Sequence, residues 1–581
     1  MKDYFGVGMR LYLDRLIDWE PLLTLRSGES VDVEAEVGAY RTILETVAAL
    51  AADFEKPARE NWSAEAELTP DGGAVPPAHM REAYAQLQEA GLVSLPVPEE
   101  YGGYGVPATM NGWVLEMVAR ADPSLMMIIG LQTGVANDIA KYGSEEIKQA
   151  FLPRFASGEV QGSMDLTEPQ AGSDLGGITT RAVDCEDGQI QVDGQKIFIS
   201  NGGAEVHLVL ARDDETFDQS KGTTNGLSLI LVPRHREDGS KNGVRVTRLE
   251  KKIGIHGSPT CEMIFEGSIG ARLGKKGQGF RAMLDLMNVA RLGVASQALG
   301  LSDAAIHDAT EYASQRKQFG KTVAEQPLVM GMLAKMIVNN EAVRALLYRT
   351  YRMVDFNAAR EAAVQREGIS EAERSEIQAE LERDTARVRL LTPLCKYFAT
   401  EVCSDITRDA VQVFGGVGFT EAADVGKYLA DSVITTIYEG TSEIQASFAL
   451  REMGKGVLAV VLREVEAELD LIARDPDLAP LADRIRNVID GLDETLKVLF
   501  SDLNYALSRA KLMAETVIDV IAGAELLNQA AVDDSRRDIA ESFIRRRMLE
   551  AASVSRRIED GVDGRFESDT RIVAAVSPSG S

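Results

Sequence analysis

The sequence predicts an α+β protein with an N-terminal helical domain, a central antiparallel β domain and a C-terminal helix bundle, followed by an additional C-terminal helical region. Two observations predict this order. The spacing of apolar residues changes from helical to β-rich and back to helical along the chain. The length, 581 residues, also exceeds what a single hydrophobic core usually serves, so several domains are expected.

Helical spacing defines the first block, for which we predict the boundaries 1–160. From about residue 31, apolar residues recur every three or four positions. Glycine pairs at 72–73 and 102–103 interrupt this pattern and mark turns between helices. The first domain is therefore expected to be helical.

In the second block, residues 161–275, short β-rich runs alternate with turn residues. Three of these runs are 206–210, 227–232 and 260–265. Short runs separated by turn residues are typical of antiparallel sheets. We therefore predict a central antiparallel β domain.

Residues 276–456 return to helical spacing in long segments rich in Ala, Leu and Met, which suits a helix bundle. Within this block, residues 358–389 are dense in Glu and Arg, which predicts a solvated helical insertion, with a partner-docking site as the alternative. Amphipathic segments continue through a helical extension, 457–565. The Ser- and Pro-containing end, 566–581, is predicted to be disordered.

Composition and charge exclude several classes of protein. The chain has 90 acidic and 62 basic residues, and its net charge of −28 disfavours nonspecific binding to nucleic acid or anionic lipid. The four cysteines lack metal-ligand spacing, so we predict neither a metal site nor a structural disulfide. No signal peptide or membrane span is recognisable, and we expect a cytoplasmic protein.

Five short segments hold the residue types expected of a cofactor and substrate site. Two combine hydroxyls with aromatic or small residues, which can flank and hydrogen-bond a flat ring. Two combine Arg or Gln with glycine turns, which suit a pyrophosphate. In the last, a carboxylate stands between an aromatic residue and a glycine, just before a helix. In chain order the segments are 164–174, 194–202, 316–320, 412–419 and 437–445.

In this order, the five segments resemble the acyl-CoA dehydrogenase family, and the resemblance runs from about residue 35 to residue 455. It implies an FAD-dependent enzyme that desaturates an acyl-CoA thioester between Cα and Cβ. Glu439 would abstract the α-proton, and flavin N5 would accept the β-hydride. A helix-capping glutamate is the alternative interpretation of Glu439.

The resemblance also identifies a second place where some members carry the base, directly before a buried arginine. The matching arginine is Arg291, which would lie near the thioester, and the residue before it is Ala290. No carboxylate therefore competes with Glu439.

Contacts with FAD are implied along most of the chain. The isoalloxazine ring would be held by Leu166, Thr167, Phe198 and Ser200, with Ser200 facing N5. The FAD of a neighbouring subunit would be reached by Arg316, Phe319, Gln412, Gly415 and Gly416. The adenosine end of the cofactor would be contacted by Thr441 and Glu443. FAD bound in this way implies at least a dimer.

The resemblance also implies substrate contacts, although the acyl group itself stays open. The candidates are Thr133, Ser173, Asn288, Arg291, Tyr438 and Gly440. Ser173, which we also count among the cofactor contacts, has a turn-capping serine as its alternative interpretation. Asn288 replaces an acidic residue that contacts pantetheine in relatives, which puts this part of the CoA arm in doubt.

The implied partners are an acyl-CoA substrate and an electron-transferring flavoprotein as the electron acceptor. The extension is expected to cover the face where four-subunit relatives pair their dimers, which favours a homodimer over a homotetramer. Membrane contact through its arginines is the less favoured alternative. An acyl-CoA oxidase and a non-catalytic acyl-CoA or flavin-binding scaffold remain as rival functions.

Overall fold

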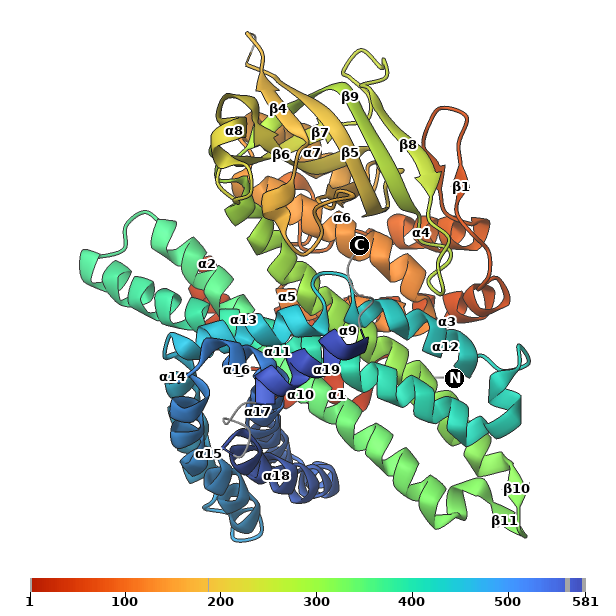
Figure 1. Cartoon of the computed structure of the whole chain (residues 1–581), viewed down its shortest axis with the longest axis vertical. Helices are drawn as coiled ribbons and strands as arrows, with labels where there is room; N and C mark the ends of the chain where they lie inside the picture. Colours follow the sequence, from red (N-terminus) through yellow and green to blue (C-terminus); the bar gives the residue numbers. More distant parts are fainter. Residues whose placement is uncertain (1–2, 187, 560–564, 577–581) are drawn as a thin grey trace. The chain divides into compact units, whose positions relative to one another are not determined.

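The computed structural model describes residues 3–186, 188–559 and 565–576 of the chain (Figure 1). It divides into two compact units, each taken by itself below. The first unit comprises Met1–Met9, Glu34–Lys317 and Cys403–Glu439, and the second comprises Arg10–Val33, Gln318–Val402 and Gly440–Ser581. The predicted α+β class, with helices before and after a β domain, is confirmed.

Helices make up most of the first unit, as the period of apolar residues predicts. They are α3 (Val33–Glu60), α4 (Ala78–Glu89), η2 (Glu99–Tyr101), α5 (Ala108–Ala121), α6 (Pro123–Tyr142), α7 (Glu145–Ala156), η3 (Leu175–Gly177), η4 (Asp214–Thr216), α8 (Phe217–Ser220), α9 (Gly279–Gln315), η6 (Gly415–Phe419), α12 (Val425–Ser432) and η7 (Val433–Thr436). The short helix α1 (Val7–Leu11) runs from the first unit into the second, and α11 (Glu371–Phe414) runs from the second into the first.

The strands of the first unit form a two-stranded hairpin and a seven-stranded sheet. The hairpin is β1 (Glu67–Leu68) and β2 (Ala74–Val75), and the sheet contains β3 (Gly162–Asp165), β4 (Arg181–Asp184), β5 (Ile190–Ser200), β6 (Val206–Asp213), β7 (Leu227–Pro233), β8 (Val244–Leu249) and β9 (Thr260–Leu273). The sheet is mainly antiparallel, as predicted, but β3–β6 and β4–β6 are parallel. Because β6 also pairs with β7, the chain of pairings β6–β4–β5–β9–β7 closes on itself.

Successive side chains of a strand point to opposite faces of the sheet, and in this closed sheet both faces are buried by apolar side chains. On β6, Leu208 and Leu210 face α6, α7 and α9, whereas Val209 belongs to the core inside the sheet. β7 repeats the pattern, with Leu229 in the outer core and Ile230 in the inner one. Figure 1 shows α6 and α7 against the sheet. The sheet is thus a rigid base for the segments that leave its edges.

The second unit is helical apart from one small hairpin, and the extension forms part of its core. It contains η1 (Tyr12–Leu16), α2 (Trp19–Ser27), β10 (Lys317–Gln318), β11 (Lys321–Thr322), η5 (Val323–Glu325), α10 (Pro327–Gln365), α13 (Ser442–Gly454), α14 (Val457–Ile472), α15 (Ala479–Leu499), α16 (Leu503–Ser508), α17 (Ala510–Val532), η8 (Asp534–Arg536), α18 (Arg537–Glu559) and α19 (Arg565–Val576). Helix α17 is buried along most of its length.

A buried polar network ties the extension to α10. The Arg349 guanidinium bonds both carboxylate oxygens of Glu468, each at 2.7 Å, and one oxygen of Glu525 at 3.1 Å. The Tyr12 hydroxyl donates to the other oxygen of Glu525 at 2.7 Å. Burial raises the pKa of Glu525, but Arg352 and Arg349 reverse this, so the net direction is down. The network is ionised and spans four elements, η1, α10, α14 and α17.

Two predictions about domain organisation differ from the structure. Residues 10–33, predicted to be part of the first helical domain, belong to the second unit. The insertion at 358–389 is helical, formed by the end of α10 and the start of α11, and most of its residues are exposed or half-buried, with Arg366 donating to the carbonyls of Leu25 and Arg26. The predicted disordered tail, 566–581, contains helix α19, and its last residues, 577–581, lie outside the described residues.

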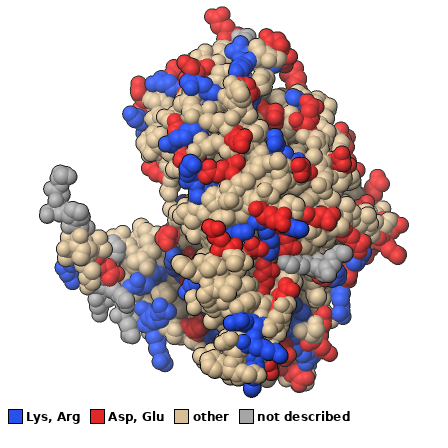
Figure 2. All heavy atoms as spheres, turned by 90° about the vertical axis from the view of Figure 1, so that its right-hand side faces the viewer, with Lys and Arg blue, Asp and Glu red and all other residues tan. Residues whose placement is uncertain are grey.

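Acidic and basic side chains are interspersed on the face shown in Figure 2, in keeping with many surface ion pairs. All four cysteines are free, and Cys261, Cys395 and Cys403 are buried. Within the described part of the chain, no helix combines the length and apolar character needed to cross a lipid bilayer.

Candidate functional site

Glu439 lies on a strained turn at the end of the first unit. Its φ is 55°, a left-handed value that side-chain-bearing residues seldom adopt, and strain of this kind is concentrated at functional sites. Its side chain is half-buried. The side-chain cap of the next helix, α13, comes from Thr441, whose hydroxyl accepts from the Ile444 N–H at 3.4 Å. Glu439 is therefore not the capping residue.

Arg291 connects helix α9 to this turn. It is only 4% exposed, and its Nε donates to the Glu439 carbonyl at 3.3 Å. Its Nη1 donates to the Asn288 Oδ1 at 3.0 Å. Burial lowers the pKa of Arg291, and the nearby charge of Glu439 opposes that change. Two predicted residues of α9, Asn288 and Arg291, thus lie together with the distant Glu439.

Tyr438, beside the candidate base, is fixed by two helices. Its hydroxyl lies 3.2 Å from the Met127 Sδ of α6 and hydrogen-bonds the Gln297 Oε1 of α9. Burial raises the pKa of Tyr438. Gln297 was not predicted, although a glutamine within the Ala- and Gly-rich stretch of α9 is a signal that could have found it. Thr133, which was predicted to contact the substrate, is buried on α6.

Gly440 begins the second unit and has a φ of 94°, which suits glycine alone. Its carbonyl accepts from the Lys396 Nζ at 2.8 Å and from the Gln445 Nε2 at 3.1 Å. Lys396 is fully buried. No sequence signal pointed to Lys396, because a lysine on a helix is usually a surface residue.

Near Gly440, Glu443 forms an ion pair with Lys511 of the extension at 2.6 Å, and this contact lowers the pKa of Glu443. Glu443, one of the two residues predicted to contact the adenosine end of FAD, is thus held by Lys511, which lies beyond the region of resemblance, 35–455. Thr441, the other predicted contact, is half-buried.

A second group of predicted residues lies where the β3 end meets β5. Phe198 is 59% exposed and has a φ of 58°. Leu166 is buried, and Thr167 and Ser200 are half-buried. The Ile197 N–H donates to the Thr167 carbonyl at 2.9 Å, which joins the two segments. An exposed aromatic ring at a strained position beside two hydroxyls fits the isoalloxazine ring of FAD.

The other predicted FAD contacts are exposed residues at or near helix ends and in a hairpin turn. Arg316 follows the end of α9, and Gln412 precedes the turn at the end of α11. Gly415 has a φ of 64°, and a Cβ on Gly415 or Gly416 would meet no described atom within 4 Å. In the second unit, Phe319 is 93% exposed. Ser173 is exposed in the loop before η3.

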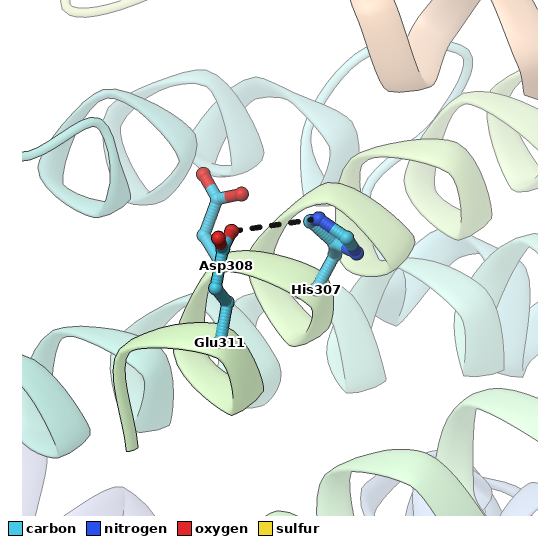
Figure 3. Close-up of side chains that lie close together, drawn as sticks. All are labelled: His307, Asp308 and Glu311. Atoms are coloured by element: carbon cyan, nitrogen blue, oxygen red, sulfur yellow. Dashed lines mark ion pairs between the residues drawn. The ribbon is translucent and has the colours of Figure 1, made fainter. Parts of the chain in front are cut away.

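One group of metal-ligand types lies on α9 (Figure 3). His307, Asp308 and Glu311 place one possible ligand atom each within 4.8 Å of the others. The Asp308 carboxylate already accepts from Arg59 at 2.6 Å and from Tyr428 at 2.7 Å. A metal ion would have to compete with the Arg59 charge, so this cluster is better explained as part of an ion-pair network.

Asp138 on α6 gives a pH-dependent prediction. It is buried, and none of the described residues hydrogen-bonds its Oδ2. Burial and then the charge of Asp285 raise the pKa of Asp138 to about 8, against the opposing effect of Lys141. In the unfolded chain an aspartate ionises near pH 4, whereas in the folded protein Asp138 keeps its proton up to about pH 8. The folded state therefore binds the proton more tightly. This contribution to stability is fully present below about pH 4 and is lost as pH rises through 8.

We therefore expect Asp138→Asn to be more stable relative to the wild type at pH 9 than at pH 5. Denaturant unfolding at both pH values measures the difference, with the exposed Asp405→Asn as the control. Parallel pH profiles for the wild type and Asp138→Asn would contradict the raised pKa.

Comparison with known proteins places this geometry in a family. Three models match the chain, namely the acyl-CoA dehydrogenase N-terminal domain over residues 39–159, the middle domain over 163–268, and the C-terminal domain over 277–370 and 374–454. An acyl-CoA dehydrogenase of Bacillus subtilis is 33% identical over 367 residues, which cover 62% of this chain and 86% of that protein.

Two further proteins resemble the chain over more of its length. A 3-methylmercaptopropionyl-CoA dehydrogenase of Ruegeria pomeroyi is 30% identical over 518 residues, covering 86% of this chain and 84% of that protein. The crystal structure of an acyl-CoA dehydrogenase complexed with FAD from Bacillus anthracis superposes with a TM-score of 0.75 at 23% identity. It covers 94% of this chain and 92% of that chain, which shows a shared fold. The chain belongs to the acyl-CoA dehydrogenase family, whose members are FAD-dependent oxidoreductases acting on CH–CH bonds.

Proposed function

We propose that this protein removes an α-proton and a β-hydride from an acyl-CoA thioester, with Glu439 as the catalytic base. The observation that carries this proposal is the strained turn at Glu439, whose carbonyl is held by the buried Arg291. A base must be fixed within hydrogen-bonding reach of the proton that it takes, and a turn anchored to α9 provides that fixation.

The surrounding residues suit the other needs of the reaction. When bound, FAD would supply the acceptor for the β-hydride. The main-chain N–H of Glu439 is our candidate donor to the thioester oxygen, where negative charge develops as the α-proton leaves. Tyr438, fixed by Gln297 and Met127, would cover the acyl group and exclude water, which strengthens these electrostatic contacts.

For substrate binding, we assign Asn288 and Arg291 to the region of the thioester and pantetheine, together with Gly440 and the exposed Ser173. Thr133 on α6 would contact the acyl chain. The name of the Ruegeria pomeroyi relative adds a thioether-containing acyl group to the substrates that merit testing.

We also propose a cytoplasmic homodimer that passes its electrons to an electron-transferring flavoprotein. Support for the dimer comes from the exposed Arg316, Gln412 and Phe319, which match family residues that reach the FAD of a neighbouring subunit. Exposed aromatic side chains such as Phe319 are typical of interfaces. A role in fatty acid metabolism by β-oxidation follows if straight-chain acyl-CoAs prove to be substrates.

The test is anaerobic addition of acyl-CoAs to the FAD-loaded enzyme. We expect the absorbance of the oxidised flavin to bleach with at least one of a set of straight, branched, aromatic and 3-methylmercaptopropionyl thioesters. Failure of every thioester to bleach the flavin would contradict the proposal. Rapid reoxidation by air, in place of an electron-transferring flavoprotein, would reassign the protein as an oxidase.

A further inference from the structure

We propose that Lys196 is a positioning residue that sets the geometry of the flavin-contacting surface, acting together with Glu168. The inference rests on the proposed function, because it takes Leu166, Thr167, Phe198 and Ser200 to contact the flavin. Neither Lys196 nor Glu168 is itself assigned a contact with cofactor or substrate.

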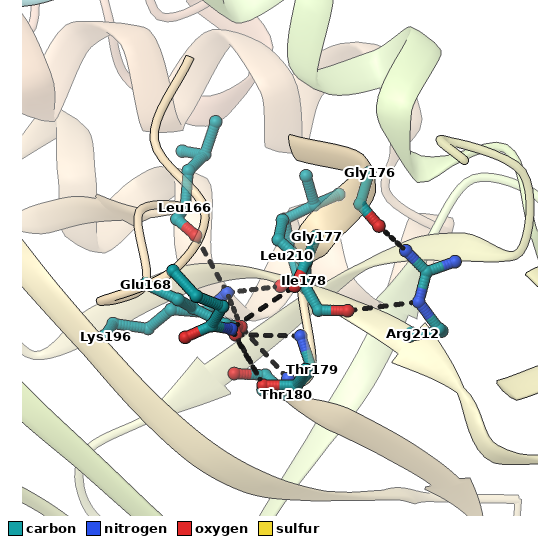
Figure 4. Close-up of polar contacts among 11 residues, drawn as sticks. Leu166, Glu168, Gly176, Gly177, Ile178, Thr179, Thr180, Lys196, Leu210 and Arg212 are labelled. Atoms are coloured by element: carbon teal, nitrogen blue, oxygen red, sulfur yellow. Dashed lines mark hydrogen bonds and ion pairs between the residues drawn. The ribbon is translucent and has the colours of Figure 1, made fainter. Parts of the chain in front are cut away.

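Lys196 is fully buried, and all three of its ammonium protons have acceptors (Figure 4). Its Nζ donates to the carbonyl of Leu166 at 2.9 Å, to the carbonyl of Leu210 at 2.8 Å, and to Glu168 Oε1 at 2.9 Å. One side chain of β5 thus holds the main chain of the Leu166–Thr167 segment against β6.

Glu168 completes the arrangement from within that segment. Its Oε1 also accepts from the Thr180 N–H at 3.0 Å, and its Oε2 accepts from the N–H and hydroxyl of Thr179, both at 2.8 Å. The Gln170 Nε2 donates to the same Oε2 at 2.6 Å. Burial alone would raise the pKa of Glu168, but the charge of Lys196 and these hydrogen bonds lower it to about 2. The carboxylate is therefore ionised, and its hydrogen bonds hold the two ends of the 166–180 segment together.

The strand that carries Lys196 also carries the second half of the flavin-contacting surface. The register of β5 against β9 shifts between Lys196 and Ile199, and Phe198 lies inside this irregularity at a φ of 58°. In a regular strand, residues two apart share a face. Here Lys196 is fully buried while Phe198 is 59% exposed. Lys196 thus fixes the strand at the point where the chain turns Phe198 outward.

Stability alone is a poor explanation of this pair. Desolvation offsets most of the attraction in a buried ion pair, and apolar replacements are often as stable. The geometry of this pair is more specific, since two main-chain carbonyls and one carboxylate must meet one ammonium group. A surface preformed in this way would bind a flat ring without reorganising first.

Arg212 offers a matched comparison in the same domain. It is equally buried and donates to the carbonyls of Gly176 and Ile178 (Figure 4). It also donates to the carbonyls of Ser220, Thr223 and Asn225. It makes none of the described hydrogen bonds with Leu166 or Thr167. Gly176 and Ile178 belong to the 166–180 segment, but loss of Arg212 leaves the Lys196 bonds to Leu166 and Glu168 in place. It should therefore loosen the domain and disturb the flavin-contacting surface less than the loss of Lys196 and Glu168.

The experiment titrates FAD into apo-protein and records the dissociation constant, the visible circular dichroism of the bound flavin, and the melting midpoint before FAD is added. The first variant is Lys196→Met, which leaves the Glu168 carboxylate buried without its cation and can therefore unfold the domain. The second variant combines Lys196→Met with Glu168→Gln, which removes that unpaired charge. For the double variant, we expect a dissociation constant between about tenfold and a hundredfold higher and an altered flavin dichroism. Arg212→Gln should lower the melting midpoint and change both flavin properties less than the double variant does.

Two results would overturn the role of Lys196. One is a double variant with wild-type flavin affinity and dichroism. The other is an Arg212→Gln protein whose flavin properties change as much as those of the double variant, because the effect would then be general loosening. A wild-type protein that fails to bind FAD would instead contradict the cofactor site on which the proposed function rests, which keeps the two failures distinct.

Discussion

Glu439→Gln is expected to suppress bleaching of the flavin by acyl-CoA and to lower the rate of flavin reduction by about 10²–10⁴-fold. General-base catalysis contributes about 10²–10⁴-fold, and Ala290 leaves no carboxylate at the other position where relatives carry the base. The amide keeps the size and the main-chain turn, so FAD binding should be unchanged. Anaerobic stopped-flow absorbance measures the rate of reduction.

Glu266→Gln is the matched control, since Glu266 is a well-exposed glutamate on β9 of the same unit. It should reduce its flavin at the wild-type rate. If Glu439→Gln were reduced at a rate close to that of the control, another group would have to be the base. The acyl-CoA used must be one that bleaches the wild type.

Arg349→Met is expected to lower the free energy of unfolding of the second unit by about 3–5 kcal/mol, because it leaves Glu525 and Glu468 without their shared cation. Glu525 is almost fully buried, so water cannot replace the guanidinium. Denaturant unfolding followed by circular dichroism measures the loss. Removing all three charges, with Glu468→Gln and Glu525→Gln added, should restore part of it.

The exposed Arg463→Met on α14 is the control and should change the free energy by less than about 0.5 kcal/mol. A loss below about 1 kcal/mol for Arg349→Met would mean that the network does not hold the extension in place. A triple variant less stable than Arg349→Met would show that hydrogen bonds, not unpaired charge, dominate its energy.

The order of domains was predictable because it depends on local periodicity. Helical and alternating patterns are properties of neighbouring residues, and the order of elements follows them closely. The parallel pairing of β3 with β6 was not predictable, because it depends on which distant strands meet. The placing of residues 10–33 failed for the same reason, since the Tyr12–Glu525 contact joins residues 513 positions apart.

In the candidate site, too, some residues could be predicted from the sequence and others could not. Glu439 stood out because its sequence context is distinctive, and Arg291 because it matches a family position. Lys396 and Lys196 gave no signal, since a lysine is buried only when the fold brings it several acceptors at once. Those acceptors are main-chain carbonyls, which any residue supplies, so the sequence cannot mark them.

The left-handed main chain at Phe198 and Glu439 has a consequence for directed evolution. Each such residue costs about 1–2 kcal/mol relative to glycine. A library of variants selected only for resistance to heat would therefore be drawn toward glycine at both positions, and the most stable variants would have lost the Phe198 ring and the proposed base Glu439. Thermal selection of this enzyme needs an activity screen in every round.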